Sequence, residues 1–354
     1  MTNNNSSCDK GSDAEIPNTH PVYLSSTMTL ADRYGAVMCR CNNKFRMKYI
    51  VAPGLYALGK PDQNSPVLVT ANYRLSLNAL RLSLGGRSIW ILVIDTKGIN
   101  VWCAAGKGTF CTNEIVKQLS ACNIKSTLSH RTLILPQLGA SGVSASKLQK
   151  ASGFSVKFGP VRASDIPAYL DNNYTASHAM RRVRFSIVDR VKLVPMETIP
   201  AFKKVGLFLL ITAVLFGMTR TGIIYRQALT GVLPLVIAGL AALFTGTILL
   251  PLLLPFIPGR AFSLKGFVTG LLGAMALILI SPRCRSTPFL IAFNLVSVPA
   301  FSSYLAFLFT GSSTYTSPSG VKVELKIAWP LYLASAGISA ILLIIVIIRF
   351  WRIV

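Results

Sequence analysis

The chain has 354 residues and a formal net charge of +24, because 36 Lys and Arg stand against 12 Asp and Glu. Such a charge is typical of nucleic-acid binding, but its distribution argues against that function. Many of the later cations stand singly between apolar runs, where cationic side chains meet lipid headgroups; they include Arg226, Arg260, Lys265 and Arg349. Only one carboxylate, Glu324, follows residue 200. A water-soluble second half is therefore excluded, and we expect no nucleic-acid partner.

The N-terminal segment, residues 1–50, is polar from Thr2 to Asp13 and lacks the charged-then-apolar run of a signal peptide. We expect it to be partly disordered and to stay in the cytoplasm with the domain that follows. The seven cysteines show neither a disulfide framework nor a four-ligand zinc spacing, which favours a reducing compartment. Cys39 and Cys41 form a CxC pair that could bind a soft metal, although an incidental pair is the favoured interpretation.

Residues 51–180 show strand signals alternating with helix signals. Strands are predicted over 65–71, 88–95 and 132–135, and helices over 112–121 and near 144–151. Residues 73–84 fit a helix or a strand, with the Gly85-Gly86 stop suiting a helix end. Alternation of this kind predicts an α/β domain with a Rossmann-like parallel sheet. The loops at 70–72, 96–108 and 136–143 would meet at the carboxyl ends of the strands, where such sheets bind ligands.

The most informative stretch is NVWCAAGKGTF at 100–110. Its Ala and Gly residues after Cys103 would let the backbone approach a flat ligand closely. A short helix starting near Trp102, together with Lys107, would stabilise a thiolate at Cys103, which is the metal-binding form. A buried structural cysteine is an equal alternative on residue chemistry alone. A phosphate-binding loop is excluded, because Val101 and Gly108 stand where that motif needs Gly and Ser or Thr.

The second half contains five apolar runs, which predict an all-α transmembrane bundle of about five helices over 205–354, after a basic linker at 181–204. The runs cover 205–218, 228–257, 264–280, 288–309 and 328–348. The cations of the linker would hold that flank on the cytoplasmic side of the inner membrane. Four or six spans also remain open. The spans carry neither an interior acid nor a histidine, so the bundle is interpreted as an anchor.

The block NVWCAAGKG at 100–108 is similar to the cap-helix motif of the mercury-methylation corrinoid protein (HgcA) family. PGLYALGKPDQNSPVLVTANY at 53–73 and LPQLGASG at 135–142 resemble the corrinoid-binding domain of the corrinoid iron-sulfur protein. Departures are the CxC pair, Cys111 close after the motif, and Ser141 where the family would have proline.

This resemblance implies a corrinoid (cobalamin) cofactor whose cobalt takes the Cys103 sulfur as its lower axial ligand. It implies a cofactor-binding set made up of the end of one strand, the cap motif and a Gly-rich loop: Thr70, Asn72, Asn100, Val101, Trp102, Cys103, Ala104, Ala105, Gly106, Lys107, Leu138, Gly139, Ala140 and Gly142. Histidine is a poor alternative lower ligand, because His20, His130 and His178 all lack the D-x-H-x-x-G context.

The implied activity is corrinoid-dependent methyl transfer from cobalt to Hg(II), producing methylmercury. The alternatives are a membrane-anchored corrinoid methyl carrier of one-carbon (acetyl-CoA pathway) metabolism and a corrinoid-binding membrane sensor or transporter. The sequence has no iron-sulfur cysteine pattern. The resemblance therefore implies a ferredoxin-like partner with two [4Fe-4S] clusters and a folate-linked methyl donor or its methyltransferase. It also implies that this chain is a multi-pass protein of the inner membrane in an anaerobic prokaryote.

Overall fold

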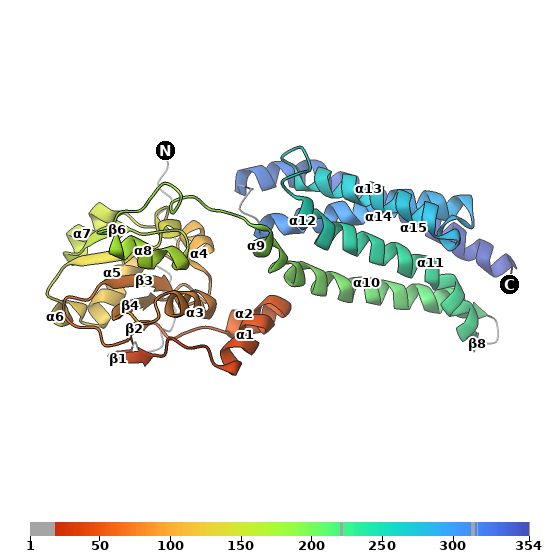
Figure 1. Ribbon diagram of the computed structural model, residues 1–354. Helices are drawn as coiled ribbons and strands as arrows, with labels where there is room; N and C mark the ends of the chain where they lie inside the picture. Colours follow the sequence, from red (N-terminus) through yellow and green to blue (C-terminus); the bar gives the residue numbers. More distant parts are fainter. Residues whose placement is uncertain (1–17, 220–221, 313–315, 317, 354) are drawn as a thin grey trace. The chain divides into compact units, whose positions relative to one another are not determined.

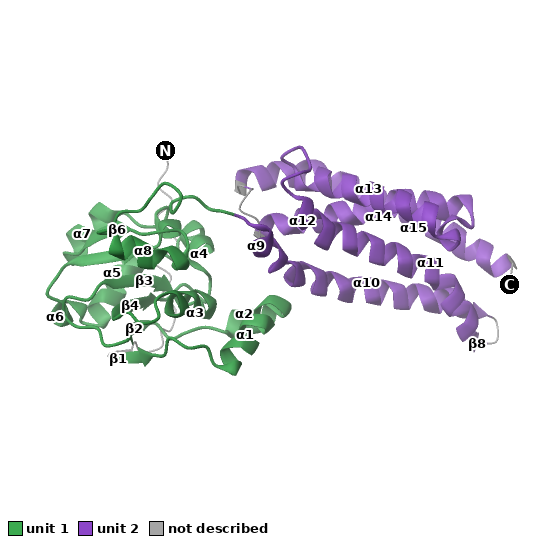
Figure 2. Ribbon diagram, in the orientation of Figure 1, with its two compact units in different colours: residues 1–184 green, residues 185–354 purple. Residues whose placement is uncertain are grey.

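The chain divides into two compact units, residues 1–184 and residues 185–354 (Figure 2). The computed structural model describes residues 18–219, 222–312, 316 and 318–353. The disorder expected in the N-terminal segment falls partly on residues 1–17, which lie outside the described residues. Residues 18–50 form β1 (Asn18–Leu24), α1 (Leu30–Cys41) and α2 (Asn43–Lys48).

A six-stranded sheet in the order β1-β2-β4-β3-β5-β6 forms the centre of unit 1. The remaining strands are β2 (Gly54–Leu58), β3 (Val67–Ala71), β4 (Ile89–Ile94), β5 (Thr132–Leu135) and β6 (Ser155–Phe158). The predicted parallel arrangement is confirmed for β4, β3, β5 and β6. β2 runs antiparallel to β4, and β1 is parallel to β2. The sequence signals missed β1, β2 and β6.

Helices cover both faces of this sheet, giving the three-layer α/β fold that the alternating pattern predicts (Figure 1). α3 (Arg74–Ser83) and α8 (Ile166–Asp171) pack on one face; α4 (Val101–Lys107), α5 (Thr112–Ala121) and α7 (Ala145–Ser152) pack on the other. Every residue of β3 and β4 is buried, as expected for central strands covered on both sides.

The ambiguous segment at 73–84 is the helix α3. Its residues Leu77 and Leu80, with Leu84 just after its end, belong to the core beneath the sheet. The helix stops before Gly86, whose φ of +82° lies in the left-handed region that favours glycine.

Among its described residues, unit 2 contains five helical stretches that are long and apolar enough to cross a membrane: Ile187–Gly217, Tyr225–Leu253, Phe262–Ile280, Pro288–Gly311 and Ser319–Arg352. This count agrees with the predicted five. Their main helices are α10 (Val194–Gly217), α11 (Tyr225–Leu243), α13 (Phe262–Ile280), α14 (Pro288–Leu308) and α15 (Pro318–Ile353). The first stretch begins earlier than expected, because α9 (Ile187–Val191) and the start of α10 occupy part of the predicted linker.

Two cations near helix ends in unit 2 are buried. Lys265, which the sequence placed among headgroups, is 9% exposed and its Nζ donates to the carbonyl of Leu254 at 2.9 Å. Arg190 donates to the carbonyls of Pro251 and Leu252 at 2.9 and 2.7 Å. These three carbonyls lie in α12 (Leu250–Leu253) or directly after it, where backbone carbonyls lack partners within the helix. Both cations therefore bind at the C-terminal end of α12, where the negative end of the helix dipole favours positive charge.

Candidate functional site

The carboxyl ends of β3, β4 and β5 bring three loops of unit 1 to one edge of the sheet, as the sequence predicts. Asn72, directly after β3, joins the first two loops. Its Oδ1 accepts hydrogen bonds from the backbone N–H of Thr96 and Gly98, both at 3.0 Å, and its Nδ2 donates to Asp95 at 3.0 Å. The Asn72 side chain, predicted to contact the cofactor, is therefore buried and engaged in fixing the loop after β4.

The motif of residues 100–108 forms α4, which is the short helix that the sequence predicts near Trp102. Asn100 is its N-cap, and the Asn100 Oδ1 accepts from the backbone N–H of Cys103 at 3.0 Å. Gly108 ends the helix with φ +78°, a left-handed conformation in which a side chain would be strained. Asn100 and Gly108 thus fix where the helix starts and stops, and with it the position of Cys103.

The two faces of α4 have different surroundings. Val101, Ala104 and Ala105 are buried in the core on this side of the sheet. Trp102, which is 38% exposed, and Gly106 lie outside that core, and Cys103 is half-buried. A Cβ added at Gly106 would meet no atom within 4 Å. The free Cys103 thiol therefore stands one helical turn from an open position on the same helix.

The glycines of the 136–143 loop are required by packing within the protein. The loop includes the short helix η1 (Gln137–Gly139), which packs against α4. A Cβ on Gly139 would lie 2.6 Å from the Phe110 ring, and one on Gly142 would overlap the Phe110 carbonyl oxygen and crowd Ala105. The small residues at 105, 139 and 142 thus let α4 approach the loop. Leu138 and Ala140 of this loop are half-buried.

We expect Gly142→Ala to destabilise unit 1 by about 1–3 kcal/mol, because the overlapped neighbour is backbone and cannot rotate away. Native-state hydrogen exchange of the protected amides in β3 and β4 would measure the loss. Gly106→Ala is the matched control, since its Cβ meets open space and Ala is the better helix former. Equal stability of the two variants would contradict the packing role of Gly142.

One other predicted residue, Thr70, lies apart from the exposed part of α4. Val69 and Ala71 belong to the core on the α4 side, so the alternating side chain of Thr70 lies on the sheet face covered by α3 and α8. Thr70 is also only 3% exposed. Lys107 is exposed in the last turn of α4. The structure brings Trp102, Cys103 and Gly106 together, but it does not bring Thr70 to them.

Three residues at the same edge were not predicted. Burial raises the pKa of the Tyr73 hydroxyl, and negative charge on Cys39 and, more weakly, on Cys103 acts in the same direction. Burial also raises the pKa of Glu114, with the Asp95 carboxylate acting in the same direction. Tyr73 and Asp95 each follow shortly after a predicted strand, and this position is the sequence feature that could have indicated their place at this edge of the sheet.

The CxC pair is divided between two environments by α1. Residues two apart on a helix do not face each other, and Cys39 is 1% exposed whereas Cys41 is half-buried. Burial raises the pKa of the Cys39 thiol, which disfavours the metal-binding thiolate. Among the described residues, no group of three or more His, Cys, Asp or Glu side chains could hold a metal ion.

Because the two thiols diverge, we expect the double variant Cys39→Ala/Cys41→Ala to keep most of the methyl-transfer activity that the sequence resemblance implies. Product formation per corrinoid-loaded protein is the quantity to measure, so that a loss of folded protein is not mistaken for a loss of transfer. A severe loss at full corrinoid occupancy would show that the pair takes part.

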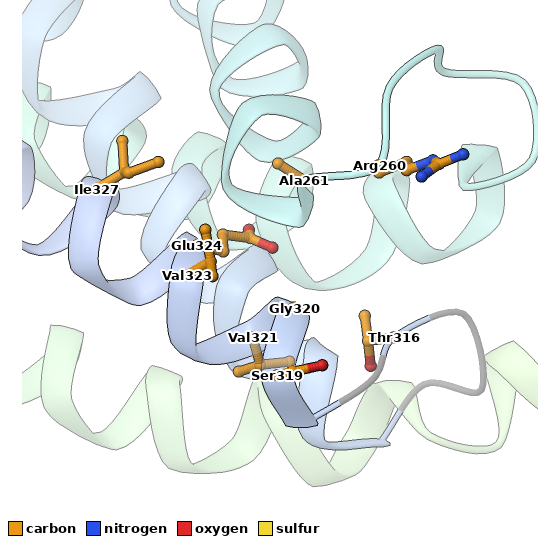
Figure 3. Close-up of a pocket in the computed structure, with 9 residues that line it drawn as sticks. All are labelled: Arg260, Ala261, Thr316, Ser319, Gly320, Val321, Val323, Glu324 and Ile327. Carbon is orange, nitrogen blue, oxygen red and sulfur yellow. The ribbon is translucent and has the colours of Figure 1, made fainter.

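Unit 2 contains a cavity of about 560 Å³ whose lining includes Arg260, Thr316 and Glu324 (Figure 3). Figure 3 shows the Arg260 side chain extending away from the Glu324 carboxylate. Glu324 accepts a hydrogen bond from the backbone N–H of Ser263 at 2.6 Å, in the first turn of α13. This carboxylate therefore caps a helix, and the residues of the candidate site all belong to unit 1.

The segment that contains every predicted site residue matches a known family. Residues 46–170 match the model for the CO dehydrogenase/acetyl-CoA synthase delta subunit. This segment is about a third of the chain and makes up most of unit 1, which is therefore similar to that subunit over these residues. Unit 2 lies outside the match.

Individual relatives are gamma subunits of the acetyl-CoA decarbonylase/synthase complex. The subunit of Methanopyrus kandleri is 37% identical over 124 residues, which is 34% of this chain and 26% of that protein. The subunit of Methanocaldococcus jannaschii is 31% identical over 131 residues, or 36% of this chain and 26% of that protein. The chain thus spans about a quarter of the length of these relatives. None of these names refers to mercury.

Proposed function

We propose that unit 1 binds a corrinoid and transfers a methyl group to Hg(II), while unit 2 anchors it in the membrane. The observation that carries this proposal is the Cys103 thiol, which is free, half-exposed and placed beside open space at Gly106. The likeness of residues 46–170 to acetyl-CoA synthase subunits supports the corrinoid part of the proposal. The resemblance of NVWCAAGKG to the mercury-methylation family supports the choice of acceptor.

The donor set of the site fits a corrinoid. Such a cofactor needs a soft donor that can reach its metal and a neighbouring surface without bulky side chains. A thiolate is a soft ligand, and Gly106 one turn from Cys103 leaves that surface open. Trp102, Cys103 and Gly106 would hold the group from α4. When bound, the corrinoid supplies the cobalt that carries and releases the methyl group.

The residues around Cys103 keep its sulfur in a fixed position. The Asn100 side chain holds the backbone N–H of Cys103, and the hydrogen bonds of Asn72 hold the loop that leads to Asn100. Ala105 and Gly142 pack the helix down onto the neighbouring loop. Cys103 would be the residue that holds the metal through its sulfur. Partners would supply the rest: a ferredoxin-like protein with two four-iron clusters as reductant and a folate-linked methyl donor.

The second candidate is a membrane-anchored methyl carrier in one-carbon metabolism. The comparisons favour it, because the named relatives are subunits of an acetyl-CoA decarbonylase/synthase complex. Five helices of this chain are long and apolar enough to cross a membrane, and they lie outside the matched segment. They favour a membrane setting for this chain that differs from the setting of the matched domain alone.

A competition assay separates the two candidates. The corrinoid-loaded, methylated full chain is offered Hg(II) and an acetyl-CoA synthase with CO and coenzyme A in the same reaction. We expect methylmercury as the main product, with little change when the synthase is left out. Methyl transfer to the synthase that outcompetes Hg(II) would establish the one-carbon carrier instead.

A further inference from the structure

The helix α1 has two opposite faces, and its inner face packs against the rest of unit 1. Asp32, Gly35 and Cys39 are its buried residues. Asp32 forms ion pairs with Arg81 and Arg74, and a Cβ on Gly35 would run into the Tyr49 ring. The orientation of α1 about its own axis is therefore determined by these contacts.

The outer face of α1 is apolar, which is the reverse of an ordinary surface helix. Leu30, Tyr34 and Val37 follow one another at spacings of four and three residues and are 82%, 64% and 56% exposed. Met47 in α2 and Ile50 just after it are also exposed, at 50% and 42%. We call the surface formed by these five side chains the α1–α2 surface; Figure 1 shows the two helices together at the margin of unit 1.

The charge around this surface has one sign. Residues 18–50 contain five Lys and Arg and a single carboxylate, Asp32, which is buried in its ion pairs. Arg33, Lys44 and Lys48 are exposed, and Arg33 lies one position from both Asp32 and Tyr34, at the border between the two faces. An apolar stripe bordered by exposed cations is the pattern of a helix that lies in a membrane interface and attracts anionic lipids.

We propose that the α1–α2 surface docks onto the anionic headgroup layer of the bilayer. An acidic protein is disfavoured as the occupant because the chain is itself covalently joined to five helices able to cross a membrane, so a lipid surface is always within reach of unit 1. The apolar residues enter the headgroup boundary, while Arg33, Lys44 and Lys48 meet lipid phosphates. Docking depends on neither the corrinoid nor the methyl acceptor.

The test places a photoreactive benzoylphenylalanine at position 34 of the full chain, in nanodiscs with or without anionic phosphatidylglycerol. The matched control carries it at position 82 of α3, where Leu82 is 52% exposed outside the α1–α2 surface. We expect lipid adducts at position 34, more of them in the anionic discs, and few at position 82. Adducts to protein segments instead of lipid, or equal lipid yields at the two positions, would overturn the proposal.

The charge requirement is tested by Arg33→Gln, Lys44→Gln and Lys48→Gln in the position 34 background. Each cation near an anionic surface contributes about fivefold to binding, so the triple variant should reduce the adducts to the level of the control position. Lys125, Lys147 and Lys150 are three exposed cations elsewhere on unit 1, and their triple Gln variant should leave the yield unchanged. An equal loss in both triple variants would show a general attraction of unit 1 and refute a dedicated surface.

Discussion

Cys103→Ala should abolish methylmercury formation by the full chain, with a loss of at least about a thousandfold if the sulfur is the donor to the metal. Such a loss corresponds to about 4 kcal/mol of transition-state stabilisation, which is within the range of a single essential ligand or donor. The substitution leaves the fold intact, because Cys103 is half-buried on α4 and its backbone contact to Asn100 does not involve the thiol. Product formation is measured under single-turnover conditions with the methyl group already loaded.

The matched control is Cys41→Ala, which removes another half-buried thiol from unit 1. It should transfer methyl groups at nearly the wild-type rate. Cys103→Ser should resemble Cys103→Ala, because an oxygen donor is harder and binds such a metal less well. Wild-type turnover by Cys103→Ala at full corrinoid occupancy would leave the proposed role of Cys103 without support.

Asp32→Asn should destabilise unit 1 by about 3–5 kcal/mol, which is the usual cost of breaking a buried ion pair on one side. Asp32 is 5% exposed and faces Arg81, whose side chain is 6% exposed. The variant leaves that guanidinium buried without a counter-charge and also weakens the Thr29 cap of α1, where the Thr29 Oγ1 donates to Asp32 at 2.9 Å. Native-state hydrogen exchange in β3 and β4 gives the free energy of unfolding.

The exposed pair of Arg87 and Asp171 is the control. Its two hydrogen bonds are 2.8 and 2.6 Å long, but the Asp171 side chain is 62% exposed. Asp171→Asn should therefore cost no more than about 1 kcal/mol. A cost for Asp32→Asn as small as that for Asp171→Asn would mean that α1 is not held through its carboxylate.

The same ion pair sets a pH dependence. Burial by itself would raise the pKa of Asp32, but hydrogen bonds from Arg81 and Thr29 outweigh it and lower the pKa to about 2. An acid whose pKa is lower in the folded state stabilises the protein above its unfolded pKa of 3.8. About 2 kcal/mol of stability should therefore be lost as the pH falls from 4 towards 2 in the wild type, and this loss should be absent in Asp32→Asn.

The strong periodic signals of the sequence predicted the elements that hold the site. The apolar run of β4 and the hydrophobic spacing over 112–121 correspond to elements found at Ile89–Ile94 and Thr112–Ala121. Five apolar runs correspond to five helices long enough to cross a membrane. These predictions succeed because hydrophobic patterning is local, so that a window of ten to twenty residues contains the signal.

Properties that depend on contacts between separate segments of the folded chain could not be predicted from the sequence. Gly139 and Gly142 are predicted to bind the cofactor, and only the structure shows that the Phe110 ring and backbone occupy the space that a side chain at either position would need. The CxC pair could bind a soft metal by its residue types, although an incidental pair is favoured, and only the structure shows that α1 turns the two thiols apart. β2 was missed because GLYAL lacks the β-branched residues of a typical strand, and its direction follows from pairing with β4.

The central claim is that the sulfur of Cys103 binds the metal of a corrinoid, and cobalt K-edge X-ray absorption tests it most directly. The full chain is purified from a corrinoid-producing host, and the cobalt content is measured on the same sample. We predict one sulfur neighbour of cobalt in the wild type and none in Cys103→Ala. A wild-type protein that retains cobalt and turns over while its metal has only nitrogen and oxygen neighbours would contradict the account.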